Sequence, residues 1–138
     1  MPLHLLKLCV GVPDLDHMLN WITQVKAGRD TADHTTRMFP KRREEILNGG
    51  SLYWVIRGMV QCRQPIAGLV AVTGDDGIGR CRIDFEPVIV PVRPVPRRAF
   101  QGWRYLDAAD APPDLKPGQR LDTLPEKMRR ELMELGLL

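Results

Sequence analysis

The chain has 138 residues, of which 43% are hydrophobic and 27% are charged, a composition that indicates a globular protein and excludes a disordered one. Its apolar runs are much shorter than a bilayer span, so the sequence predicts no transmembrane helix. The N-terminal stretch MPLHLLKLCVGV lacks the basic start and the small-residue cleavage site of a signal peptide. We therefore expect a cytoplasmic protein made of a single domain over residues 1–138.

The formal net charge is +3, and the basic residues are concentrated between residues 37 and 104. Arginine greatly outnumbers lysine in the chain. The planar guanidinium group suits phosphate and carboxylate and stacks on bases. A high genomic GC content would give the same bias without any function. The charge pattern therefore points toward anionic ligands without identifying one.

The first third of the chain predicts a strand, a helix and a second, shorter helix. Residues 3–10 are apolar at both parities, which is typical of a strand covered on both faces. Asp14 is placed to cap a helix that Gly28 would end, and residues 28–33 form a polar loop. Residues 34–39 are expected to be extended, with Pro40 in the first turn of a short helix that ends at Gly49 or Gly50.

The middle third predicts strands. Residues 51–63 form one strand with Leu52, Trp54, Ile56, Val60 and Cys62 on its core face, and residues 66–72 form a second, buried strand. The TGDDGIG stretch is a hairpin turn, and the strand after it has an inward face. After Pro87 the inward parity changes, as it does where a strand turns a barrel corner. The inward residues are Cys81, Ile83 and Phe85 before the change and Val88, Val90 and Val92 after it.

The last third begins with a basic, proline-stiffened segment over residues 93–105 and a Pro-rich connector over residues 106–122. Thr123 and Glu126 have the spacing of a capping box at the start of a final helix. The apolar stripe of this helix could be ordinary core or could pack on a second copy of the chain. The stripe consists of Leu124, Met128, Leu132 and Leu135.

Clustered, mostly antiparallel strands with segregated helices indicate the α+β class. With the parity change, they predict a small barrel-like curved sheet with two or three peripheral helices.

Catalytic and metal-binding motifs are weak. His34 begins an H-T-T triplet like the H-x-S/T motif of histidine phosphodiesterases, but His4 and His17 do not supply the second motif that those enzymes need. We assign no catalytic residue and lean against an enzyme, although a small nucleotide-directed hydrolase or transferase using His34 stays an alternative. The scattered histidines and cysteines have no metal-ligand or redox spacing, so we predict no metal, no cofactor and buried free thiols at Cys9, Cys62 and Cys81.

The positive signal is a set of basic residues interleaved with aromatic ones, which is the composition of nucleic-acid sites. The alternative is a solvated surface on which the arginines pair with acids and the aromatic rings belong to the core. The candidate residues are Arg37, Lys41, Arg42, Tyr53, Arg57, Arg63, Arg97, Arg98, Trp103 and Arg104. Lys41 and Arg42 would contact phosphate at the start of the short helix.

Several long stretches resemble a family of short bacterial proteins catalogued as a domain of unknown function: LHLLKLCVG, HTTRMFPKRREEILNGGSLYWVIRG, VQCRQPI and RPVPRRAFQGWRYL. This resemblance implies a small intracellular single-domain protein and no known activity. The order of elements from the short helix through SLYWVIRG and IAGLVAV is also similar to PUA-like domains, including the ASCH and EVE groups, which are pseudo-barrels that bind RNA or modified bases.

We therefore expect a non-enzymatic module that binds RNA or another phosphate-bearing ligand, with no membrane partner. A protein-interaction or homodimeric module using the C-terminal helix is the alternative.

Overall fold

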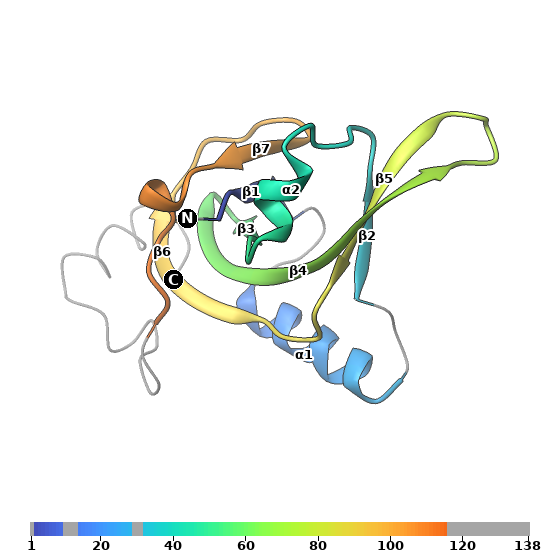
Figure 1. The fold of residues 1–138 in the computed structure, drawn as a ribbon. Helices are drawn as coiled ribbons and strands as arrows, with labels where there is room; N and C mark the ends of the chain where they lie inside the picture. Colours follow the sequence, from blue (N-terminus) through green and yellow to red (C-terminus); the bar gives the residue numbers. More distant parts are fainter. Residues whose placement is uncertain (1, 10–13, 29–31, 116–138) are drawn as a thin grey trace.

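The computed structural model describes residues 2–9, 14–28 and 32–115, and these form a mixed, mostly antiparallel sheet with two α-helices (Figure 1). The predicted α+β class is therefore confirmed. The predicted C-terminal helix, with its cap Thr123 and its apolar stripe, lies outside the described residues. In chain order the elements are β1 (His4–Leu8), α1 (Leu15–Lys26), β2 (Asp33–Thr36), α2 (Arg43–Leu47), β3 (Ser51–Ile56), β4 (Met59–Thr73), β5 (Gly79–Phe85), β6 (Val90–Pro96), β7 (Trp103–Leu106) and the 3-10 helix η1 (Ala108–Asp110).

The sheet has seven strands in the order β2-β5-β4-β3-β1-β7, and β6 pairs with β4 outside this path. The pair β1–β3 is parallel, while the other strand pairs are antiparallel. The long strand β4 pairs with β3 and β6 over its first part and with β5 over its second part. Figure 1 shows β4 as a long curved ribbon whose far end forms a hairpin with β5 that projects from the rest of the protein.

Helix α1 forms where the sequence predicts it. The Asp14 carboxylate accepts a hydrogen bond of 2.9 Å from the backbone N–H of His17, which satisfies one of the free donors of the first turn. Gly28 has a φ of +75°, the left-handed conformation that favours glycine after a helix. Met18 and Ile22 are buried, and they join the core cluster of the sheet.

Helix α2 is shorter than predicted, and Pro40 is not in its first turn. The helix begins at Arg43, and Arg42 before it has non-helical backbone angles. The N–H of Arg42 donates a hydrogen bond of 3.3 Å to the Tyr105 hydroxyl. A tertiary contact that local sequence does not reveal therefore occupies a donor at the point where we predicted a phosphate-binding helix start.

The single strand predicted over residues 51–63 is wrong, because these residues form the β3–β4 hairpin. Ile56 pairs with Met59 around a turn made of Arg57 and Gly58, which have φ values of +53° and +78°. Two positive φ values are the signature of a type I′ turn. The second predicted strand, over residues 66–72, is the continuation of β4 rather than a separate element.

Two hydrophobic clusters stabilise the sheet, and the strand β3 is buried along its whole length. Leu52, Trp54 and Ile56 enter the larger cluster, which also contains Cys62 as predicted. Val60 was expected on that face but lies in the second cluster, because the pairing shifts register between Val60 and Cys62. The second cluster consists of Leu6, Tyr53, Val55, Val60, Val92 and Leu106.

The strand β5 alternates as predicted, with Cys81, Ile83 and Phe85 buried. The inward parity expected after Pro87 holds for Val92, which is fully buried. It is wrong for Val88, which is 40% exposed, because Ile89 turns into the core in its place.

Gly50 joins α2 to β3 at a position with no room for a side chain. Its N–H donates to the Ile46 carbonyl at 2.7 Å, and its own carbonyl accepts from Ile66 N–H at 3.1 Å. A Cβ atom here would collide with the carbonyl oxygens of Leu3 and Ile46. Both are backbone atoms, which cannot move away as a flexible side chain can.

We predict that Gly50→Ala lowers the free energy of unfolding by about 3 kcal/mol, because the added methyl group must displace packed backbone. Urea denaturation would measure the change. The control is Gly79→Ala, where a Cβ meets nothing within 4 Å and the change should stay within about 0.5 kcal/mol. Equal stability of the two variants would contradict the predicted close packing at Gly50.

Candidate functional site

The segment between β6 and β7 folds into an open surface pocket of about 590 Å³ with three arginines among its lining residues. The pocket is lined by Pro96, Arg97, Arg98, Ala99, Phe100, Arg104 and Tyr105. None of these residues is acidic, so the charge of the three guanidinium groups is not neutralised within the lining. We call this surface the arginine pocket.

Arg104 is held in place by three contacts within the segment. Its guanidinium carbon lies 5.3 Å from the centre of the Phe100 ring. One guanidinium nitrogen donates to the carbonyl oxygens of Gln101 and Trp103, at 2.8 and 3.1 Å. These contacts use only one of the nitrogens, so Arg104 retains donors that can reach an anion.

Arg97 and Arg98 are exposed at the start of this segment. The backbone N–H of Arg97 donates a hydrogen bond of 2.8 Å to the carbonyl of Gly58. The β3–β4 turn, with the exposed Arg57, therefore lies directly beside the arginine pocket. The basic candidate residues fall into three segments of the sequence, over residues 37–43, 57–63 and 93–104, and the second and third segments meet at this hydrogen bond.

The first of these basic segments meets the pocket at Tyr105. The Arg42 guanidinium lies 5.5 Å from the centre of the Tyr105 ring, and it forms a two-pronged ion pair with Glu45 at 2.6 and 2.9 Å. The hydrogen bond and charge of Arg42 lower the pKa of the Glu45 carboxyl. Arg37 and Lys41 are exposed nearby in the chain, between β2 and α2.

Trp103 ties the arginine pocket to the segment before α2. Its indole N–H donates a hydrogen bond of 2.8 Å to the carbonyl of Met38, and its ring meets the Tyr105 ring edge to face at 4.8 Å. The side chain is half-buried against the larger core cluster. Trp103 therefore contacts the pocket residue Tyr105 and anchors it to the segment before α2.

The structure does not bring Tyr53 and Arg63 to this surface. Tyr53 is only 4% exposed and packs in the second core cluster, so its prediction as a surface ring is wrong. Both faces of β3 are covered by hydrophobic clusters, which strand parity alone does not reveal. Arg63 forms two hydrogen bonds to the Asp114 carboxylate, at 2.7 and 2.8 Å, and a third to the Ser51 hydroxyl at 2.9 Å.

His4 is a buried histidine in this same region, and no sequence pattern marks it. Its Nδ1 atom accepts a hydrogen bond of 2.9 Å from the N–H of Ser51, and its ring meets Tyr53 edge to face at 5.1 Å. Burial lowers the pKa of the His4 imidazole, and the charge of Arg63 lowers it further. The neutral, hydrogen-bond-accepting form is therefore the one that the fold stabilises.

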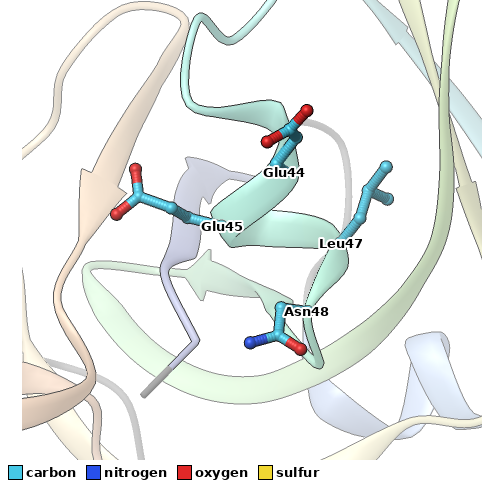
Figure 2. Close-up of a pocket in the computed structure, with 4 residues that line it drawn as sticks. All are labelled: Glu44, Glu45, Leu47 and Asn48. Carbon is cyan, nitrogen blue, oxygen red and sulfur yellow. The ribbon is translucent and has the colours of Figure 1, made fainter.

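A second surface pocket, of about 530 Å³, lies along α2 and is lined by Glu44, Glu45, Leu47 and Asn48 (Figure 2). Figure 2 shows the four side chains pointing away from one another rather than toward a common centre. Glu45 is already paired with Arg42. This surface therefore lacks the converging groups that a binding site needs.

His34, the residue of the H-T-T motif, lines neither of these two pockets. It is half-buried on β2, and its ring meets Trp54 edge to face at 5.5 Å. Burial lowers the pKa of the His34 imidazole, and the charge of Lys7 adds to this effect while that of Asp33 opposes it.

The three cysteines are free, and Cys62 and Cys81 are buried as predicted, whereas Cys9 is only half-buried. Burial raises the pKa of the Cys9 thiol to about 11, so it is protonated at neutral pH. Within residues 2–9, 14–28 and 32–115, no group of three or more histidines, cysteines and carboxylates could hold a metal ion. Over the same ranges, no helix is long and apolar enough to cross a membrane.

The fold and the pocket define an α+β domain with an arginine-lined surface site. The chain belongs to the family described as Protein of unknown function (DUF1489), whose model matches residues 5–138. No curated protein and no solved structure matches the chain. The family therefore agrees with the resemblance seen in the sequence and adds no activity to it.

We predict that acid weakens the fold in part through His4. Because the folded-state pKa of His4 lies below its ordinary value of 6.5, the unfolded chain binds more protons as the pH falls through that value. The contribution of His4 to the free energy of unfolding should therefore be complete above about pH 7, and it should decrease as the pH falls below about 6.5. Urea denaturation between about pH 5 and 8 would measure it.

The matched variant is His4→Asn, whose amide oxygen can accept the Ser51 hydrogen bond without titrating. The free energy of unfolding of this variant should depend less steeply on pH than that of the wild type. The pH dependence that persists includes the contribution of His34. Parallel curves for the two proteins would contradict the role of His4.

Proposed function

We propose that this protein is a non-enzymatic binding module for RNA or another phosphate-bearing ligand, and that the arginine pocket is its binding surface. The observation that carries the proposal is the convergence of Arg97, Arg98 and Arg104 around a pocket without acidic lining residues. An anion entering this pocket would meet several cations and displace no carboxylate. Guanidinium groups form two-pronged hydrogen bonds with phosphate, which makes arginine suited to this task.

The aromatic residues support a nucleic-acid ligand over free phosphate. Phe100 and Tyr105 line the pocket, and each lies under an arginine: Arg104 over Phe100 and Arg42 over Tyr105. A guanidinium plane held on a ring offers its other face to a base, and single-stranded nucleic acids are bound by such stacking together with backbone contacts. We therefore favour single-stranded RNA among phosphate-bearing ligands.

We also propose that the sheet is a small barrel-like structure of the PUA-like kind. Two observations support this: β4 carries a register shift between Ile66 and Gly68, and the chain after β7 returns to β6. There Val92 forms a bridge with Asp114, and the N–H of Arg93 donates to the Pro113 carbonyl at 2.9 Å. This pairing links the β7 end of the sheet to the β6 side of β4.

The test is binding of a fluorescein-labelled uridine oligonucleotide by the wild type and by the double variant Arg97→Gln/Arg98→Gln. We expect the wild-type affinity to fall with salt, and the double variant to bind more weakly at low salt. The slope of log affinity against log salt is negative, and its magnitude should decrease by about 1.4 in the double variant, because each of the two lost phosphate contacts on a single strand contributes about 0.7.

The control is Arg82→Gln/Arg93→Gln, which removes the same net charge from residues outside the pocket. It should bind almost as the wild type does. Absence of wild-type binding at low salt would overturn the proposed function. An equal loss in both double variants would show that net charge, and not the pocket, attracts the oligonucleotide.

A further inference from the structure

Arg57 has an unusual backbone conformation for an arginine. Its φ is +53°, and it is the one residue other than glycine with a positive φ in the part of the chain that the structure describes. It occupies the first central position of the type I′ turn between β3 and β4, followed by Gly58. That first position strongly prefers glycine, which has no Cβ atom to crowd the following carbonyl oxygen, or asparagine and aspartate, whose short polar side chains can hydrogen-bond the local backbone.

No side-chain contact with the described residues offsets the strain at Arg57. The side chain is exposed, and it has no ion pair, hydrogen bond or ring contact with residues 2–9, 14–28 or 32–115. Several other arginines do have such partners, namely Arg42, Arg63, Arg80, Arg82 and Arg104. A strained residue that has no side-chain partner among the described residues is a reason to look for a ligand contact.

The turn is joined by backbone contacts to the segment that forms the arginine pocket. The Gly58 carbonyl accepts the 2.8 Å hydrogen bond from Arg97 N–H, and Arg97 begins the wall of the pocket. On the other side of the turn, Met59 pairs with Pro96 at the end of β6. Arg57 is therefore presented from a well-supported turn next to the pocket.

We propose that Arg57 contacts a second phosphate of the ligand whose first phosphate lies in the arginine pocket, so that the ligand is an oligonucleotide rather than a mononucleotide. This inference rests on the proposed function, because it takes the pocket to be the binding surface. The left-handed turn holds the guanidinium away from the sheet, where asparagine or glycine would be more stable but could not reach a phosphate. The strain at Arg57 is offset when the oligonucleotide is bound.

The decisive variant is Arg57→Asn, which creates the preferred Asn-Gly sequence of a type I′ turn. We expect its melting temperature to rise by roughly 3 °C, because asparagine adopts the left-handed conformation at a lower cost than arginine. Its affinity for the uridine oligonucleotide should fall roughly three- to tenfold at low salt, and its salt slope should decrease by about 0.7. A variant that is more stable and binds more weakly cannot owe its weaker binding to misfolding.

Two matched variants complete the experiment. Arg57→Lys keeps the cation and the strain, so its melting temperature should equal that of the wild type and its salt slope should be unchanged. Arg93→Gln removes one exposed positive charge from β6, outside the pocket, and should leave the salt slope unchanged.

The outcomes separate this inference from the proposed function. If the wild type binds, the Arg97→Gln/Arg98→Gln variant binds weakly and Arg57→Asn binds like the wild type, the inference about Arg57 is overturned while the pocket stands. An unchanged or lower melting temperature for Arg57→Asn would overturn the strain argument. Equally tight binding of polyglutamate would show that the turn recognises an acidic peptide, and would overturn the assignment to an oligonucleotide.

Discussion

The hydrogen-bonded pairing of β4 is the interaction on which the rest of the structure depends. Its first part lies between β3 and β6 and its second part pairs with β5, so one strand joins the two regions of the sheet. The register shifts along β4 allow a single strand to serve three partners, because each shift changes the direction in which side chains point. Cys62 consequently enters one hydrophobic cluster and Val60 the other. Both helices and the loops of the arginine pocket are attached to this framework (Figure 1).

The arginine pocket is formed by one stretch of the chain, residues 96–105, and specific hydrogen bonds hold this stretch against segments that are distant in the sequence. The indole of Trp103 binds the Met38 carbonyl, the Tyr105 hydroxyl accepts from Arg42, and Arg97 binds the Gly58 carbonyl. Each bond joins the β6–β7 segment to another part of the chain. The arginines of this segment are therefore attached to a hydrogen-bonded backbone, which lowers the conformational-entropy cost of binding a ligand. Arg42 and Arg63 differ from the pocket arginines, because each forms an ion pair with a carboxylate of the protein itself.

The candidate site could be predicted only in part from the sequence, and the residues show why. Arg97, Arg98 and Arg104 lie close in the chain, and all three line one pocket. Tyr53 was assigned to the surface by strand parity, yet the second cluster buries it, because both faces of β3 are covered. Arg63 was expected among the ligand-binding residues, but Asp114 pairs with it from a position about fifty residues later. Pairing and burial of this kind depend on which strands become neighbours, and a single sequence does not reveal that.

The sequence by itself determined the local features: the Asp14 cap and Gly28 end of α1, the hairpin turn after β4 and the alternation along β5. These features follow from backbone preference and side-chain periodicity within a few residues. Only the tertiary structure decided that Arg57 and Gly58 form a turn, because an arginine in the left-handed conformation is locally unfavourable and needs the β3–β4 pairing to impose it. It also decided that three basic segments meet around Tyr105 and Gly58, since contacts between distant segments depend on the pairing of the whole sheet.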